Sequence, residues 1–326
     1  MILAGDIGGT KTNLAYVKQG GERLELGRSA GYPSRNHGTF QEIVRHFVTA
    51  YPQKIEVAAF GIAGPVIGGR CEATNLPWVV DAGVIGESLG GVPTTLLNDL
   101  EATAYGVLRL EAGDLAVLNI GEADSGGTIA VIAAGTGLGE GGLVWNGSHY
   151  IALPSEGGHT DFAPRNELEI ELLRFMLRRH DRVSYERLVS GPGLFTLYEF
   201  FRERSAVKEP AWLAEQISGG DPSAAVSRAA MEGKDDSCRA ALGLFASLYG
   251  AETGNLALKL LSRGGVYVCG GIAPKILPRL RDGAFLASFV HKGRFSPLLQ
   301  RMPVSIVLNE RTAILGAAHV ALSLQR

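Results

Sequence analysis

The first stretch of the chain that could do chemistry is GDIGGTKT, residues 5–12. Its glycines let a ligand approach main-chain N–H groups closely, Thr10 and Thr12 add hydroxyl donors, and Lys11 adds positive charge. Such a turn is typical of a cradle for a polyphosphate. Asp6 favours this interpretation, because a carboxylate can face phosphates when a Mg²⁺ ion, often held through water, lies between them. The alternative is a tight hairpin that binds no ligand.

Two better-known phosphate-binding motifs do not fit the chain. A Walker P-loop requires glycine where Thr10 stands and a helix after it, whereas residues 13–20 have the pattern of a strand. Residues 137–142, GLGEGG, formally match a dinucleotide-binding fingerprint, but no amphipathic helix follows them. We therefore expect a second phosphate-contacting hairpin there, with Thr136 as its hydroxyl donor.

Asn98 and Asp99 fall where an apolar strand ends and a helix begins, in LLNDLEATAYG. Ligands gather at such positions in α/β folds. An ionised Asp99 that faces a substrate hydroxyl can accept its proton as the oxygen attacks a γ-phosphoryl group. The alternative is a helix N-cap, which contributes about 1 kcal/mol. One residue can serve both purposes.

Glu156 and His159 stand in PSEGGHTDFAPRNE. Glu-x-x-His places two metal ligands on one face of a helix, so a carboxylate-bridged iron site is a hypothesis. Two intervening glycines argue against a helix, and the chain has no second such motif on an amphipathic helix. Glu and His on a turn are better suited to hydrogen-bonding a polyol. A structural histidine is the alternative.

Three other acidic residues carry little signal by themselves. Glu186 has no motif around it that indicates chemistry, and its alternative is a solvated carboxylate on an exposed helix. Asp235 and Asp236 could be a catalytic carboxylate pair, but acids that precede a helix are favoured by capping and by the helix dipole alone.

The elements that position these residues alternate along the chain. Apolar patterning predicts strands at 1–6, 13–20, 55–64, 93–99, 114–121, 128–137, 264–271 and 304–309, and helices at 99–110, 166–180 and 238–262. Interleaved strands and helices indicate an α/β protein. Two hairpins with glycine-and-threonine turns suggest two related halves. The alanine-rich segment from 202 to about 237 is expected to form short helices.

Composition limits the classes of partner. The chain has 326 residues, 46% of them hydrophobic and 20% charged, which suggests about two domains. A formal net charge of −2 argues against nucleic acid and anionic lipid as partners. The first residues contain no leader, and no apolar run is long enough to cross a membrane, so we expect a cytoplasmic protein. Three widely spaced cysteines are expected to be buried and unpaired.

The motifs taken together resemble the bacterial glucokinase family, a non-zinc relative of the ROK sugar kinases. That family has the two-domain actin/hexokinase/Hsp70-like (ribonuclease H-like) ATPase fold, with mixed sheets flanked by helices and a cleft between the domains. The resemblance covers nearly the whole chain and rests on six segments in order: GDIGGTKT, LLNDLEA, AAGTGLGEG, PSEGGHTDFAPRNELE, YERLVSGPGL and VCGGIAPKILP.

The resemblance implies roles for individual residues. Contacts to ATP are implied for Gly5, Asp6, Ile7, Gly8, Gly9, Thr10, Lys11, Thr136, Gly137, Gly270 and Gly271, the last two against the adenosine. Asp99 matches the catalytic base. Glucose contacts are implied for Asn98, Asp99, Glu156, His159, Glu186 and Asn75. Asp6 is the expected Mg²⁺ site, through water.

The resemblance also implies a domain layout and an activity. Residues 1–110 form a small α/β domain completed by a C-terminal helix at 308–326, and residues 111–307 form a large α/β domain with a helical insertion. The implied activity is ATP-dependent phosphorylation of D-glucose at the 6-hydroxyl, by a homodimer. Closure of the two halves when glucose binds is a separate hypothesis, since it would exclude water before the chemical step. ROK enzymes have a cysteine-rich zinc motif after Glu-x-x-His, whereas TDFAPRNELEIELL has no cysteine, so we expect no structural zinc. A kinase for mannose, fructose or an N-acetylhexosamine and a non-catalytic sugar sensor remain open.

Overall fold

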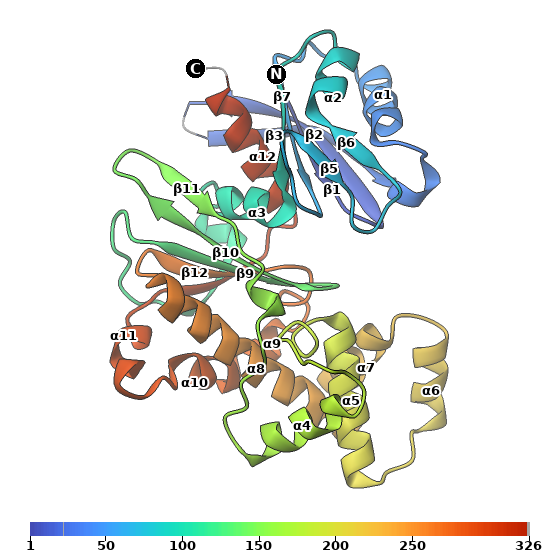
Figure 1. Cartoon of the computed structure of the whole chain (residues 1–326), viewed down its shortest axis with the longest axis vertical. Coiled ribbons are helices and arrows are strands. Elements are labelled where there is room, and N and C mark those ends of the chain that lie inside the picture. Colours follow the sequence, from blue (N-terminus) through green and yellow to red (C-terminus); the bar gives the residue numbers. More distant parts are fainter. Residues whose placement is uncertain (22, 325–326) are drawn as a thin grey trace. The chain divides into compact units, whose positions relative to one another are not determined.

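The computed structural model describes residues 1–21 and 23–324, which form two units (Figure 1). Unit 1 comprises Met1–Leu115, Ser148–Leu153 and Asn309–Arg326, and unit 2 comprises Ala116–Gly147 and Pro154–Leu308. Each unit is built on a mixed β-sheet with helices packed against it, so the expected α/β class is confirmed. The last two residues of the C-terminal helix expected at 308–326 lie outside the described residues.

Unit 1 contains a five-stranded sheet in the order β3-β2-β1-β4-β7. The first three strands in the chain pair antiparallel, and β1, β4 and β7 run parallel. The bounds are β1 Ile2–Ile7, β2 Lys11–Gly20, β3 Arg23–Pro33, β4 Val57–Ile62 and β7 Thr94–Asn98, with a separate ribbon of β5 Arg70–Glu72 and β6 Val79–Asp81.

Helices cover both faces of this sheet, because successive side chains of a strand point to opposite faces. Leu3 and Ile7 of β1 pack into a core with α1 (Phe40–Ala50) and α2 (Ala82–Ser88). Ile2 and Ala4 pack on the other face, in a core with α3 (Asp99–Val107) and α12 (Thr312–Ser323). The short helices η1 (Ser34–Asn36) and η2 (Ala112–Asp114) complete unit 1.

Glycines allow α3 and α12 to pack at backbone distance. A Cβ atom on Gly316 would lie 1.7 Å from the carbonyl oxygen of Ala102, and one on Gly106 would lie 2.0 Å from that of Thr312. We predict that Gly316→Ala destabilises the protein by about 3 kcal/mol, because rigid backbone atoms must separate. Chemical denaturation measures the loss. Gly113→Ala is the control, since open space surrounds that position.

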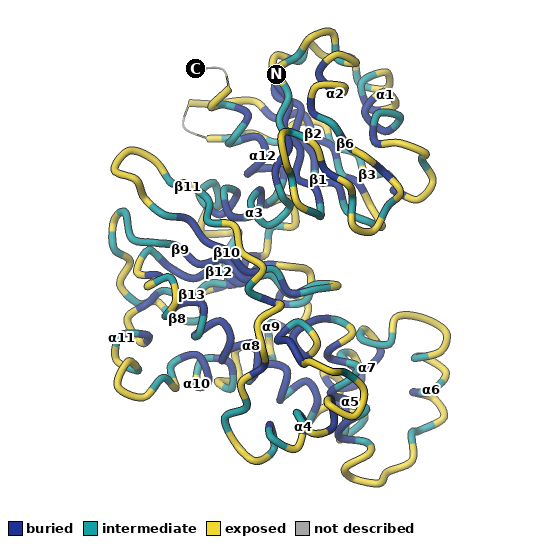
Figure 2. The backbone as a smooth tube through the Cα atoms, viewed as in Figure 1, coloured by how far each residue is buried: buried dark blue, intermediate teal, exposed yellow. Residues whose placement is uncertain are grey.

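The second sheet has six strands in the order β11-β10-β9-β12-β13-β8. All of them belong to unit 2 except the edge strand β11, which is part of unit 1, and the first residue of β8. The bounds are β8 Leu115–Asn119, β9 Ile129–Ala134, β10 Leu138–Trp145, β11 Tyr150–Leu153, β12 Gly265–Cys269 and β13 Val304–Val307. β9 and β10 form the second expected hairpin, antiparallel from Leu138 opposite Ala134 to Leu143 opposite Ile129. The central strands are almost wholly buried (Figure 2).

The helices of unit 2 enclose one large hydrophobic core. Their bounds are α4 Glu167–Leu177, α5 Gly191–Ser205, α6 Ala211–Ser218, α7 Pro222–Met231, α8 Asp236–Leu260, α9 Leu277–Leu280, α10 Ala284–Val290 and α11 Ser296–Gln300, with η3 Gly157–His159 and η4 Gly293–Phe295. Helices α6 and α7 lie in the segment where short helices are predicted. The side chain of Asp235 accepts a hydrogen bond from Cys238 N at 2.8 Å, so its capping interpretation is confirmed. All three cysteines are buried and unpaired, as expected.

Candidate active site

The turn between β1 and β2 is the first predicted phosphate cradle. Gly8 N donates to Lys11 O at 3.1 Å, and Ser34 binds both sides of the turn: its N–H donates to Thr10 O and its hydroxyl to Gly8 O. A Cβ atom on Gly9 would lie 2.7 Å from Cβ of Asn75, so the predicted sugar-contact asparagine packs directly against the turn. The turn is thus braced before any ligand binds.

The other residues of GDIGGTKT serve the strands on either side. A Cβ on Gly5 would lie 2.5 Å from Cδ2 of Leu14, so this glycine is needed for packing within the sheet. The side chain of Ile7 is buried in the core. Lys11 extends beside Gly31 on β3. Thr12, expected as a hydroxyl donor to phosphate, is fully buried and hydrogen-bonded to Ser34 at 2.9 Å.

The carboxyl ends of three parallel strands bring Asp6, Asn98 and Asp99 together. Asp6 lies opposite Gly61 of β4, and the next pair on β4 and β7 is Ile62 opposite Asn98. A Cβ on Gly61 would lie 3.7 Å from Cα of Asp99, so the start of α3 crosses this edge of the sheet. Burial, followed by the charge of Asp99, raises the pKa of Asp6 to about 6.

Asn98, rather than Asp99, is the N-cap of α3. Its side-chain oxygen accepts hydrogen bonds from Leu100 N at 2.9 Å and Glu101 N at 3.3 Å, and its amide donates to Gly64 O at 3.1 Å. Asp99 is the first residue of the helix, and its Oδ1 also accepts from Leu100 N at 2.9 Å. The alternative that Asp99 is the N-cap of α3 is therefore wrong, because Asn98 caps the helix.

In unit 2, the turn from Gly135 to Gly137 joins β9 to β10. Gly135 N donates to Gly137 O at 2.8 Å, and Thr136 is exposed. The carboxylate of Glu186 lies against this turn: its Oε2 accepts from Leu138 N at 2.9 Å and is 2.4 Å from the point that a Cβ on Gly137 would occupy. A predicted sugar contact and a predicted phosphate turn are therefore in direct contact.

Glu186 and the segment after Glu156 form one cluster. Glu186 N donates to Gly158 O at 2.9 Å, and Oε1 of Glu186 is 3.8 Å from Nδ1 of His159. Their side chains are 30% and 54% exposed, so a ligand can reach both. Glu186 stands in a turn, which makes the exposed-helix alternative wrong. The glycines between Glu156 and His159 form a 3-10 turn, although a helix was not expected there.

Gly270 and Gly271 follow β12, at the end of the strand that lies beside the carboxyl end of β9. Gly270 has φ +84°, and a Cβ there would lie 2.3 Å from Ala134 O, so only glycine fits. The hydroxyl of Tyr249 on α8 braces this end, because it accepts from Ala134 N at 3.2 Å and donates to Cys269 O at 3.3 Å.

A cavity of about 610 Å³ opens beside these glycines in unit 2. Thr136 and Gly271 line it, together with residues that sequence reasoning missed: Gly191, Pro192, Phe195, Asp221, Ser223, Ser227, Ile272 and Lys275. Ser223 Oγ donates to Gly191 O at 2.6 Å, which ties α7 to α5. The GPG segment at the start of α5 belongs to a motif that the sequence analysis used. No sequence pattern predicts that α7 lines the cavity opposite this segment.

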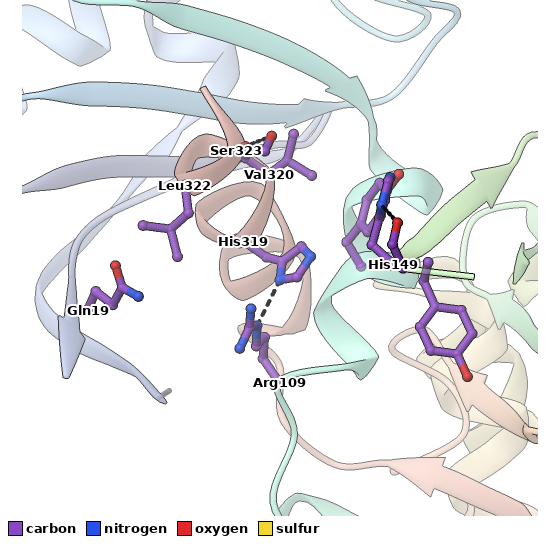
Figure 3. A pocket seen from close by; sticks show the side chains of 10 residues that line it. Gln19, Arg109, His149, His319, Val320, Leu322 and Ser323 are labelled. Atoms are coloured by element: carbon purple, nitrogen blue, oxygen red, sulfur yellow. Dashed lines mark hydrogen bonds between the residues drawn. The ribbon is translucent and has the colours of Figure 1, made fainter. Parts of the chain in front are cut away.

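A second cavity, of about 660 Å³, lies in unit 1 and contains none of the predicted site residues (Figure 3). Arg109 Nε donates to Nδ1 of His319 at 2.8 Å, and the His319 ring stacks on Tyr105. Burial and the neighbouring guanidinium lower the pKa of His319 to about 4, so the ring is a neutral acceptor. This pair joins α12 to the end of α3.

Residues 1–21 and 23–324 contain no group of three or more His, Cys, Asp or Glu side chains arranged to hold a metal ion. Within the same residues, the helices are too short or too polar to cross a bilayer.

Comparison with known proteins identifies the family. The profile of the family described as Glucokinase matches residues 3–324. A glucokinase from Nostoc sp. is 44% identical over 334 residues, which cover 98% of each chain. The crystal structure of a glucokinase from an Antarctic psychrotroph has a TM-score of 0.88 at 30% identity, over 99% of this chain and 98% of that one.

A more distant structure shares the fold. The ROK family glucokinase from Streptomyces griseus, solved in complex with glucose and AMPPNP, has a TM-score of 0.67 at 21% identity over 99% of both chains. The expected resemblance and fold class are thus confirmed. From the profile match and the 44% identical relative, the chain belongs to the glucokinase family.

Proposed function

We propose that this protein, a phosphotransferase of the glucokinase family that phosphorylates glucose with ATP, uses Asp99 as the general base on the 6-hydroxyl of the sugar. The observation that carries the proposal is the gathering of Asp6, Asn98 and Asp99 at one edge of the unit 1 sheet. Because Asn98 caps α3, Asp99 is not required for that task. Its carboxylate is suited to orient a hydroxyl and accept its proton late in the transfer.

The two glycine turns are suited to the triphosphate. The turn at residues 8–10 is braced by Ser34, and the turn at 135–137 is braced by Glu186. Phosphoryl transfer spreads charge over the phosphate oxygens, so fixed N–H donors contribute by positioning and neutralising them. Gly5, Ile7 and Lys11 support the first turn from the flanking strands. The cavity beside Gly271 has the size and apolar lining expected for the adenosine.

Glucose is proposed to contact six residues: Asn75, Asn98, Asp99, Glu156, His159 and Glu186. These side chains offer amide donors, carboxylate acceptors and an imidazole, which match the hydroxyl groups of a polyol. The contact between Glu186 and the 135–137 turn links recognition of the sugar to the position of the phosphates.

Asp6 is the residue proposed to hold Mg²⁺, through water. The ion prefers oxygen ligands and commonly keeps several waters. A partly buried carboxylate with its pKa raised to about 6, beside a second carboxylate, fits a divalent cation, because the cation offsets their repulsion. When bound, the ion neutralises charge on the phosphates.

A magnesium titration tests this role. We predict that Asp6→Asn raises the Mg²⁺ concentration needed for half-maximal activity at least tenfold. It should also weaken Mg²⁺-dependent ATP binding in calorimetry, a readout that needs no turnover. An unchanged magnesium dependence in both measurements would remove Asp6 from the metal site.

A coupled ADP-release assay across a panel of hexoses with Mg-ATP tests the function itself. The expected result is turnover with glucose well above that with mannose, fructose or N-acetylhexosamines. Faster turnover of another hexose would make that sugar the substrate. Sugar binding without ADP release would indicate a sensor. Light scattering on the same sample tests the proposed homodimer.

A further inference from the structure

Two carboxyl groups are buried in unit 2 close to the proposed sugar site. Glu140 on β10 is 1% exposed and Glu252 on α8 is 0% exposed. Neither side-chain oxygen of Glu140 accepts a hydrogen bond from a described donor. A buried carboxylate that accepts no hydrogen bond is strongly disfavoured, so Glu140 cannot be an ordinary ionised side chain in this place.

Two donors near the pair bind Glu252. Asn255 Nδ2 donates to its Oε2 at 2.7 Å, and Lys259 Nζ donates to its Oε1 at 3.3 Å. Glu252 is therefore the anion of the pair. A protonated Glu140 is a donor rather than an acceptor. The carboxylate of Glu252 is close enough to interact with it and can accept its proton in a hydrogen bond.

The charged and titratable groups around Glu140 agree with this assignment. Burial, and then the charge of Glu252, raises the pKa of Glu140 to about 8, while Lys259 partly opposes the shift. The phenol of Tyr249, on α8, also interacts electrostatically with Glu140. Lys292, after α10, interacts electrostatically with Glu252 and donates to Asn255 Oδ1.

The pair lies under both segments that carry the proposed unit 2 sugar contacts. Oε2 of Glu140 is 2.4 Å from the point that a Cβ on Gly157 would occupy, so it touches the turn between Glu156 and His159. Asn255, which binds Glu252, also donates to the hydroxyl of Tyr185 at 3.2 Å. Tyr185 directly precedes Glu186.

We propose that Glu140 is a positioning residue that keeps its proton, donates it in a hydrogen bond to Glu252, and thereby holds the 156–159 turn and the 185–186 segment in the form that binds glucose. The inference rests on the sugar contacts proposed above. When base in the solvent removes this proton, two negative charges share one buried space, and the turn against Glu140 must shift.

The test is the pH dependence of the glucose KM. For wild type, KM is expected to be constant below about pH 7 and to rise about tenfold by pH 9, because the binding-competent fraction falls about tenfold one unit above a pKa near 8. For Glu140→Gln the profile is expected to be flat, since an amide donates to Glu252 at every pH. Glu215→Gln, on the exposed face of α6, is the control and keeps the wild-type rise.

A second variant separates positioning from packing. Glu140→Ala is expected to raise the glucose KM at pH 7 at least tenfold, whereas Glu140→Gln restores it to within about twofold of wild type. If the alanine variant does not fold, the pH profile of the glutamine variant decides alone. A KM for Glu140→Gln that rises with pH as in wild type overturns the inference.

Thermal unfolding gives a readout without substrate. In the folded protein Glu140 holds its proton up to about pH 8, whereas the unfolded side chain loses it near 4.5. Stability from this group is complete below about pH 4.5 and declines as pH rises to about 8. The Tm of wild type should therefore fall relative to Glu140→Gln over this range. If the difference in Tm between the two proteins does not change with pH, Glu140 does not hold a proton in the folded protein.

The two proposals fail in different ways. Without ATP-dependent turnover of glucose the proposed function fails, and with a glucose KM unaffected by Glu186→Ala the proposed sugar contacts fail. With both of those as expected and Glu140→Gln behaving as wild type, only the role of Glu140 fails.

Discussion

Asp99→Asn is expected to lower kcat by about 10²- to 10⁴-fold, the usual loss when a general base is removed. Asparagine has the same shape and keeps an oxygen that can accept from Leu100 N, as Asp99 Oδ1 does at 2.9 Å. The fold should therefore persist, with a stability loss below about 1 kcal/mol from the missing first-turn charge. Steady-state kinetics and thermal unfolding measure the two effects.

Glu101→Gln is the matched control, since it removes another carboxylate from the first turn of α3. Its kcat should stay within a few-fold of wild type. If Asp99→Asn keeps more than a tenth of the wild-type kcat, Asp99 is not the base. A loss equal to that of Glu101→Gln would point to helix stability instead.

Glu186→Ala is expected to raise the glucose KM about 10- to 100-fold, because hydrogen bonds to charged groups contribute about 1.5–3 kcal/mol. The effect has two sources. The carboxylate near His159 is lost, and Leu138 N loses its acceptor at the base of the 135–137 turn. Titrations of glucose and ATP in turn separate the effect on each KM. Glu203→Ala, an exposed carboxylate paired with Arg178, is the control.

Gly137→Ala tests the same carboxylate without removing it. The added methyl would lie 2.4 Å from Oε2 of Glu186, so the side chain must move. We expect a rise in the glucose KM in the same direction as for Glu186→Ala. Gly135→Ala, where the methyl meets open space, should leave the glucose KM near that of wild type. Equal glucose KM values for the two glycine variants would contradict the contact.

The sequence predicts most of the fold because the strongest patterns are local. The β1–β2 and β9–β10 hairpins and the long helix α8 follow from glycine turns and apolar spacing, and all three are present. No prediction was made for β3, which alternates exposed and half-buried positions, or for α1 and α5. The place of β3 depends on tertiary packing. The two helices do have a local signal that the predictions missed: the buried residues Phe40, Ile43, Val44 and Phe47 of α1 and Leu194, Leu197, Tyr198 and Phe201 of α5 have helical spacing.

The candidate site also contains residues with a local sequence signal and residues without one. Asp6, Asn98 and Asp99 could be found because parallel strands end together at one edge. Glu186 had no local signal, since its place beside Gly137 depends on a turn 49 residues away in the chain. The α7 wall of the cavity proposed to hold the nucleotide and the buried Glu140–Glu252 pair also arise only when distant segments pack.

A crystal structure with glucose and a non-hydrolysable ATP analogue is the most direct test of Asp99 as the base. The account predicts a carboxylate oxygen of Asp99 about 2.6–3.2 Å from the 6-hydroxyl of the sugar, with that hydroxyl facing the γ-phosphorus. An Asp99 carboxylate that binds only Leu100 N while the sugar hydroxyl lies against another group would contradict it.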